Sequence, residues 1–76
     1  MTNVTPNEGT VAAVRGSVID VSFPERIPAI YHVLKAGTEQ EIVMEVVSHL
    51  DATTVRSIAL TPTRGLWRGA RVIDTR

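Results

Sequence analysis

Side chains that could do acid–base or metal chemistry are few in this 76-residue chain, and they stand apart from one another. The chain has two histidines, His32 and His49, and no cysteine, so a thiolate–imidazole zinc site is not indicated. Glu41 and Glu45 would lie roughly 13 Å apart along a strand, which is too far for the paired carboxylates of glycosidases. We therefore predict no catalytic residues and no metal-binding residues.

Nucleophile and phosphate-binding motifs are missing as well. No serine stands in a G-x-S-x-G elbow, and the five glycines form neither G-x-x-x-x-G-K-[ST] nor G-x-G-x-x-G. The only close pair, Gly65 and Gly69, predicts a loop in which glycine permits positive φ and Trp67 partly covers the barrel end. These patterns predict a small domain with no enzyme activity and no bound cofactor of its own.

The elements that would position these residues are strands. Val and Ile dominate a hydrophobic fraction of 43% that includes only three aromatic residues. We predict that residues 1–8 form a disordered N-terminal lead-in and that residues 9–76 form one domain. Strands are expected at residues 9–14, 17–23, 30–34, 41–50, 54–60 and 70–74. Their regular spacing and the absence of a helical period predict an all-β fold, a small closed six-stranded antiparallel β-barrel.

The clearest pattern lies in residues 41–60, which we predict to form an antiparallel hairpin. Ile42, Met44, Val46 and Leu50 share one side of a two-residue repeat and should face the core. Asp51 is well suited to the turn that follows. A single hairpin is only marginally stable in water, so the other strands must cover its apolar face.

The charge is balanced overall but unevenly placed along the chain. Residues 1–55 carry seven acids and three bases, whereas residues 56–76 carry five arginines and one acid. Either folding intermixes these charges, or the domain has opposite edges suited to head-to-tail packing in a ring. The basic part has only one aromatic residue, which argues against a nucleic-acid footprint.

Several short strings, in one order over residues 9–76, resemble the catalytic β subunit of F-type ATP synthases. That family opens with G-x-V-x-x-V-x-G-x-V-x-D-V-x-F. The matching strings here are GTV (9–11), VRGSVIDVSFP (14–24), PAIY (28–31), EVVSHL (45–50), TVRSIAL (54–60), GLWRG (65–69) and VIDT (72–75). Trp67 departs in part from the family's usual aliphatic residue. The divergence also fits a second ATPase operon, including a sodium-type machine.

The resemblance implies an excised N-terminal barrel that sits in the crown of the catalytic head and alternates with α-subunit barrels in a hetero-hexameric ring. The parent would synthesise or hydrolyse ATP, coupled to H+ or Na+ transport. Its nucleotide-binding domain, absent here, would hold ATP or ADP with Mg2+. We expect a cytoplasmic location, peripheral to the inner (plasma) membrane, with the membrane reached only through the whole complex.

The candidate subunit-interface residues are Arg64, Arg68 and Arg71, since they concentrate positive charge near the end of the chain. We expect them to contribute to a contact with an α-type barrel. The alternative function is a free-standing small β-barrel that binds single-stranded nucleic acid, which one Trp and one Tyr support poorly.

Overall fold

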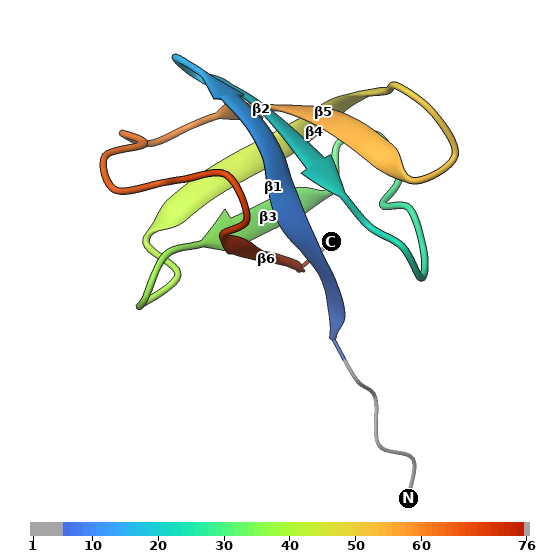
Figure 1. Cartoon of the computed structure of the whole chain (residues 1–76), viewed down its shortest axis with the longest axis horizontal. Helices are drawn as coiled ribbons and strands as arrows, with labels where there is room; N and C mark the ends of the chain where they lie inside the picture. Colours follow the sequence, from blue (N-terminus) through green and yellow to red (C-terminus); the bar gives the residue numbers. More distant parts are fainter. Residues whose placement is uncertain (1–5, 76) are drawn as a thin grey trace, which may run out of the picture.

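The computed structural model describes residues 6–75 of the chain, and the regular elements in that part are all strands (Figure 1). They are β1 (Asn7–Arg15), β2 (Val18–Ser22), β3 (Val33–Ala36), β4 (Ile42–His49), β5 (Thr54–Ala59) and β6 (Arg71–Asp74). Each strand pairs with two others in the order β1-β2-β5-β4-β3-β6, and β1 pairs with β6 to close the ring. All pairings are antiparallel. The predicted all-β, closed six-stranded antiparallel barrel is confirmed.

The first strand begins earlier than predicted. Asn7 and Glu8 pair with Asp74 and Ile73 on β6, so the last two residues of the expected lead-in belong to the barrel. Pairing with β6 stabilises this polar stretch, which local sequence could not indicate. The remainder of that lead-in prediction, residues 1–5, lies outside the described residues.

The tight bend expected at Gly16 is present and joins β1 to β2 as a hairpin. Gly16 has φ of +60°, a conformation that glycine adopts without steric strain. The strand predicted at residues 30–34 is displaced, because β3 starts only at Val33. The backbone turns first, with the N–H of His32 donating to the carbonyl of Ala29 at 3.1 Å.

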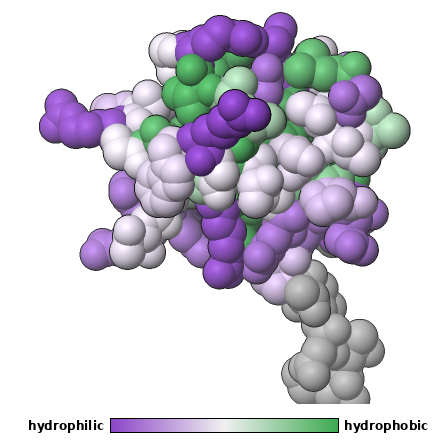
Figure 2. All heavy atoms as spheres, in the orientation of Figure 1, coloured by the Kyte–Doolittle hydropathy of each residue, from purple (hydrophilic) through white to green (hydrophobic). Residues whose placement is uncertain are grey.

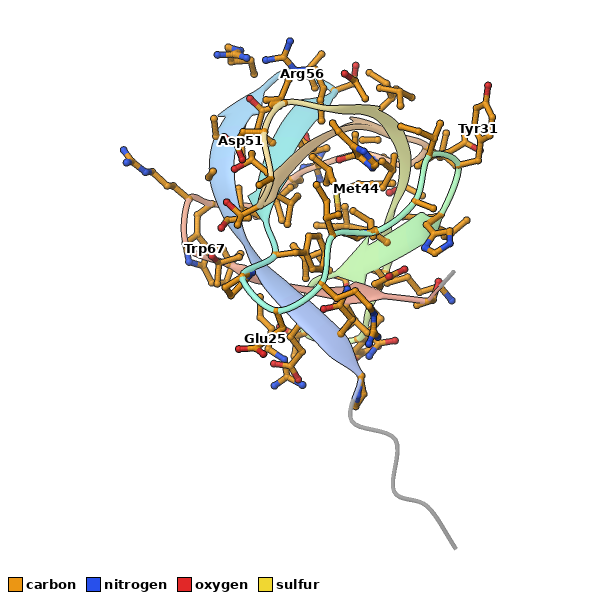
Figure 3. All side chains as sticks on the ribbon, turned by 90° about the vertical axis from the view of Figure 1, so that its right-hand side faces the viewer. Glu25, Tyr31, Met44, Asp51, Arg56 and Trp67 are labelled. Atoms are coloured by element: carbon orange, nitrogen blue, oxygen red, sulfur yellow. The ribbon has the colours of Figure 1, made fainter. Side chains whose placement is uncertain are left out.

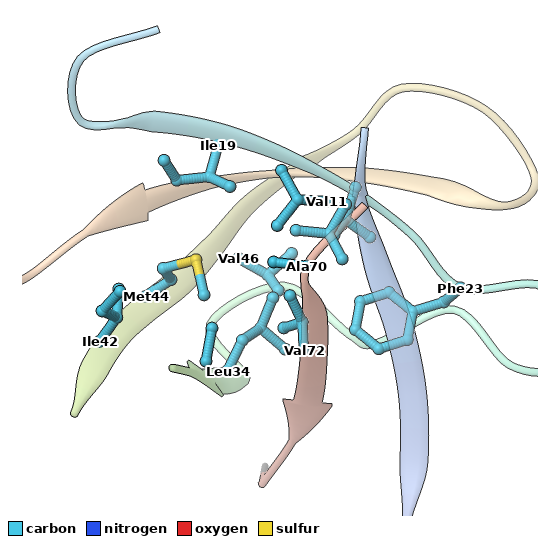
Figure 4. Packing of buried hydrophobic residues seen from close by; sticks show 12 residues of the cluster. Val11, Ile19, Phe23, Leu34, Ile42, Met44, Val46, Ala70 and Val72 are labelled. Atoms are coloured by element: carbon cyan, nitrogen blue, oxygen red, sulfur yellow. The ribbon is translucent and has the colours of Figure 1, made fainter. Parts of the chain in front are cut away.

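A single, largely aliphatic core fills the barrel (Figure 4). Its buried members are Val11, Ile19, Val21, Phe23, Leu34, Ala36, Ile42, Met44, Val46, Val55, Ala70 and Val72. Ile27, from the proline-flanked loop after β2, and Leu66 pack against this cluster. Gly9 lets the chain pass close to Phe23, since a Cβ there would lie 2.9 Å from a ring carbon and would also collide with the Ser22 carbonyl.

The hairpin over β4 and β5 is confirmed, with one correction. Ile42, Met44 and Val46 are buried as predicted, but Leu50 is 43% exposed. The register between β4 and β5 shifts between Val46 and Ser48, the signature of a β-bulge. The extra residue ends the strict alternation, so the position four residues beyond Val46 no longer faces the core.

The outside of the barrel is mixed in character. The face seen in Figure 2 is largely hydrophilic or intermediate, with hydrophobic residues gathered toward its upper rim. Over residues 6–75, no helix has the length and apolarity needed to cross a membrane.

Candidate subunit-interface site

The connection between β5 and β6 is built from two consecutive turns of the same kind. The N–H of Leu66 donates to the carbonyl of Thr63 at 3.0 Å, and the N–H of Ala70 donates to the carbonyl of Trp67 at 3.0 Å. Gly65 (φ +84°) and Gly69 (φ +93°) occupy the third position of each turn, where a type II turn requires positive φ. The predicted role of the two glycines is confirmed. We call residues 63–70 the arginine turns.

Arg64 and Arg68 occupy the second position of the two turns, and both are exposed. This position projects its side chain outward, while the backbone is fixed to β1. The N–H of Gly69 donates to the carbonyl of Val11 at 2.7 Å, and the N–H of Val11 donates to the carbonyl of Ala70 at 2.9 Å. The loop that carries both arginines is thus anchored beside β1 (Figure 1).

Arg71, the third predicted residue, begins β6 and differs from the other two. Its guanidinium lies 3.0 Å from the carboxylate of Glu8 on β1. The side chain of Arg71 is 70% exposed and that of Glu8 is 42% exposed, so solvent screens this ion pair and it contributes little to stability. The structure therefore brings Arg64 and Arg68 into equivalent positions and engages Arg71 within the barrel.

The charges of the two halves of the chain are partly intermixed. Arg56 on β5 donates through Nε to Asp20 on β2 at 2.9 Å, and Arg15 approaches the same carboxylate at 3.3 Å. The hydrogen bond from Arg56 holds the pKa of Asp20 below its usual range, against the opposing effect of desolvation. Two of the late arginines, Arg56 and Arg71, thus pair with acids of the first half. Among the late arginines that the structure describes, the opposite-edges interpretation is left with Arg64 and Arg68.

Trp67, predicted to cover the barrel end in part, is 62% exposed, whereas the preceding residue, Leu66, packs against the core. Type II turns on either side fix which of the two side chains points inward. A hollow of about 200 Å³ lies beside Trp67, lined also by Gly37, Thr38, Ala70 and Arg71.

A second exposed surface lies over β4 and was missed at the level of sequence. Ile30 (37% exposed), Tyr31 (73%) and Val47 (39%) form what we call the tyrosine patch. Tyr31 has φ of +74°, an uncommon conformation for a bulky residue. The sequence of residues 30–34 is typical of a strand, so the exposed position of Tyr31 was not predicted. No local sequence signal indicates positive φ at a tyrosine.

The candidate acid–base residues do not assemble into a reactive centre. The Nδ1 of His32 lies 3.2 Å from Asp74, while the Nε2–H of His49 donates to the carbonyl of Pro28 at 2.7 Å. Each imidazole thus stabilises a connection between distant segments. In the part of the chain that the structure describes, no three His, Cys, Asp or Glu side chains gather as a metal site would require.

The closed ring of six short antiparallel strands defines the class of small β-barrel domains. Residues 11–76 match the sequence model described as "ATP synthase alpha/beta family, beta-barrel domain", and the chain belongs to that family. The resemblance to β subunits seen in the sequence strings is confirmed.

Three relatives illustrate the similarity. The chain is 52% identical over 73 residues to ATP synthase subunit beta 2 of Shewanella frigidimarina, covering 96% of the chain and 15% of that protein. It is 55% identical over 69 residues to subunit beta 2 of Albidiferax ferrireducens (91% and 13%) and 49% identical over 67 residues to subunit beta 1 of Chlorobaculum tepidum (88% and 14%). The chain thus spans about 15% or less of these relatives' lengths.

The alternative of a single-stranded nucleic-acid barrel is not supported. Such barrels stack successive bases on neighbouring aromatic side chains in a basic groove. Here the two exposed aromatic residues, Tyr31 and Trp67, lie on opposite sides of the barrel (Figure 3). They cannot form one stacking platform.

Proposed function

We propose that this barrel is an assembly domain of a rotary ATP synthase β subunit, which joins α-type barrels side by side in a hetero-hexameric ring at the crown of the catalytic head. The single observation that carries the proposal is identity near 50% to ATP synthase β subunits over almost the whole chain. The closed barrel supports it, because a ring of hydrogen-bonded strands resists deformation while attached domains change conformation.

Within this function, Arg64, Arg68 and Arg71 contribute to one α-type contact. Guanidinium groups suit subunit contacts, since they form planar hydrogen bonds with carboxylates and stack on aromatic faces. Arg64 and Arg68 reach outward from anchored turns, which limits the conformational entropy lost on binding. Trp67 lies between them in sequence and adds the kind of aromatic surface that dominates binding energy at many interfaces.

The parent β subunit would synthesise or hydrolyse ATP, coupled to H+ or Na+ transport, and would bind ATP or ADP with Mg2+ outside this barrel. It would sit on the cytoplasmic side, peripheral to the inner (plasma) membrane through the assembled complex. The barrel contributes no group to catalysis in this proposal. Isothermal titration calorimetry of the purified chain with Mg-ATP should therefore give no binding heat. Binding with a micromolar dissociation constant would contradict the proposal that nucleotide binds outside this barrel.

The assembly proposal is tested by co-expressing the chain with the α subunit encoded beside its parent gene. We expect the two to co-purify at low salt, and failure to associate would overturn the proposal. The Arg64→Glu/Arg68→Glu double variant should weaken the association about tenfold or more, because it reverses charges that pair with no other described residue. Arg26→Glu, an exposed arginine far from the arginine turns in sequence, is the matched control.

Adding Arg71→Glu to the double variant should weaken the association further, but this change also breaks the pair with Glu8. A Glu8→Gln variant separates the two effects, since it removes the same internal pair and leaves the arginine in place. Unchanged affinity of the triple variant at low salt would remove the three arginines from the contact.

A further inference from the structure

The last strand of the ring, β6, has shorter pairings than the strand opposite it. It pairs with β1 over four positions and with β3 over three, whereas β5 pairs with each of its neighbours over five. Backbone bonds extend the contact at both ends of β6. The N–H of Val11 donates to the carbonyl of Ala70 at 2.9 Å, and the N–H of Thr75 donates to the carbonyl of Val33 at 2.8 Å. We call residues 70–75, which lie between β1 and β3, the strap (Figure 1).

The strap can leave the ring without breaking any pairing between the other strands. Strands β1 to β5 are consecutive in the chain and pair in the unbroken row β1-β2-β5-β4-β3. Within the strap, Ala70 and Val72 belong to the core, whereas Arg71 is exposed. Opening therefore exposes few core side chains and frees one edge of β1 and one edge of β3.

Polar contacts around Asp74 hold the strap on both sides. The carboxylate of Asp74 lies 3.2 Å from Nδ1 of His32, just before β3, and 3.4 Å from Nδ2 of Asn7 on β1. The side chain of Asp74 is only 4% exposed, so its carboxylate needs hydrogen-bonding partners in place of the water it has lost. We call Asn7, His32 and Asp74 the latch.

The polar groups of the latch are incompletely satisfied in the closed barrel. Nδ2 of Asn7 donates to the carbonyl of Arg26 at 2.6 Å as well as reaching Asp74. Its buried Oδ1, however, accepts from no group within residues 6–75. A buried acceptor without a donor raises the free energy of the closed state, and contact with water on opening removes that cost.

The wall opposite the strap is satisfied in its corresponding contacts. Strand β5 lies three places from β6 in either direction around the ring. Its Arg56 binds both carboxylate oxygens of Asp20 on β2, at 2.9 and 3.2 Å, and the buried Oγ of Ser57 donates to the carbonyl of Ile19 at 2.8 Å. Water therefore competes better for the contacts of the latch than for those of β5.

We propose that the strap opens and recloses as one unit while β2, β5 and β4 remain paired, and that Asp74 is the side chain that latches it. The opening is a property of the barrel itself, beyond the proposed function and independent of it. The closed state is the dominant one, because opening breaks the pairings on both sides of β6 and exposes Val72. Conformational change in the barrel is thereby concentrated at one seam, and the β5 wall keeps its shape.

Native-state hydrogen exchange of the purified chain, followed for single amides by NMR, tests the opening. Val11 and Thr75 are the two strap amides, since their bonds hold its two ends. Ala59 and Leu60 are the two wall amides, since they bond the end of β5 to the chain on either side at 2.8 and 2.7 Å. We expect the strap amides to have protection factors within about threefold of each other and about tenfold or more below those of the wall amides.

Two results of this measurement would overturn the inference. Equal protection of all four amides would mean that the barrel opens only by global unfolding. Fast exchange of Thr75 combined with a Val11 amide as protected as Ala59 would mean that the strand frays locally and does not open as a unit.

Two conservative variants separate opening of the strap from global unfolding. Asp74→Asn removes a charge whose contacts break in both processes, so it should lower the protection of the strap amides and the wall amides alike, by about tenfold. Asp20→Asn removes a pair that stays intact when only the strap opens. It should lower the protection of the wall amides and leave that of the strap amides within about twofold. Equal losses at all four amides in Asp20→Asn would contradict a separate opening of the strap.

A reversible crosslink tests the opening with the latch left in place. Glu8 on β1 lies directly opposite Ile73 on the strap, and the chain has no cysteine, so Glu8→Cys/Ile73→Cys should form a single disulfide across the seam. Oxidation should raise the protection of the Val11 amide about tenfold or more, and reduction should restore it. Glu45→Cys/Ile58→Cys, at an opposed pair on β4 and β5, is the matched control and should leave Val11 within about twofold in either redox state. Unchanged exchange of Val11 behind the oxidised seam would rule out the strap.

Discussion

Asp20 on β2 and Arg56 on β5 are directly paired neighbours on adjacent strands of the barrel, although 36 positions separate them in the chain. The Nε of Arg56 donates to one carboxylate oxygen at 2.9 Å and an Nη donates to the other at 3.2 Å. This bidentate geometry is the strong form of the arginine–carboxylate pair. It joins β2 to β5, a pairing between strands that are not consecutive in sequence.

The Asp20–Arg56 pair makes the free energy of unfolding depend on pH in the acid range. The folded-state pKa of Asp20 is lowered, so its contribution is complete above its unfolded pKa of about 3.9 and is lost as the pH falls through the lower folded value. Asp20→Asn should therefore lower the urea midpoint at pH 7, and its deficit should shrink steadily below about pH 4. Urea unfolding between pH 7 and pH 2.5 measures this, with the exposed Glu25→Gln as control. A deficit that is constant over this range would assign the effect to packing instead of charge.

Shortening a buried side chain of β4 should destabilise the barrel far more than shortening a side chain of β4 in the tyrosine patch. Met44 is fully buried in the barrel, whereas Val47, on the same strand, is 39% exposed. Met44→Ala should lower the free energy of unfolding by about 2–5 kcal/mol, because it leaves a cavity in a close-packed interior. Val47→Ala should change it by less than about 0.5 kcal/mol. Equal losses in denaturant unfolding would mean that the outward surface of β4 is part of the core.

Gly9 should not tolerate even the smallest side chain. A Cβ at this position would meet the Ser22 carbonyl and lie 2.9 Å from the ring of Phe23, so the chain or the ring must move. Gly9→Ala should destabilise the barrel by about 1–3 kcal/mol, as overpacking does elsewhere. Thr10→Ala, at the exposed neighbour, should cost less than about 1 kcal/mol. Thermal unfolding of both variants checks the order, and a neutral Gly9→Ala would show that Phe23 can move freely.

Replacing Tyr31 and Gln40, the two described non-glycine residues with positive φ (+74° and +58°), with glycine should not destabilise the fold. The left-handed backbone conformation costs a non-glycine residue about 1–2 kcal/mol. Replacing that residue with glycine removes this cost, but the greater conformational entropy of glycine in the unfolded chain offsets about 0.5–1 kcal/mol of the gain. Tyr31→Gly and Gln40→Gly should each raise the free energy of unfolding, by up to about 1 kcal/mol. Chemical denaturation measures the change. A loss above about 1 kcal/mol for Tyr31→Gly alone would mean that its ring stabilises the barrel, which its exposure argues against.

Much of the candidate site could be read from sequence because its determinants are local. Gly65 and Gly69 predicted positive φ, and each follows the arginine that the turn projects outward. The tyrosine patch could not be predicted, because Tyr31 is held by a hydrogen bond to Val46, 15 positions away in the chain. Leu50 was assigned to the wrong face for a related reason, since the bulge at Val46–Ser48 depends on how β4 pairs with β5.

The sequence by itself determined that this protein is a six-stranded all-β domain, because alternation along each strand and glycine or proline between strands act over a few residues. Family membership was also readable from short strings in a fixed order. Only the tertiary structure decided which strands are neighbours and which are opposite. Barrel closure brings together residues as distant as Asn7 and Asp74 and sets the arginine turns and the tyrosine patch on opposite sides. These relationships arise from the pairing of the whole ring, which no single segment encodes.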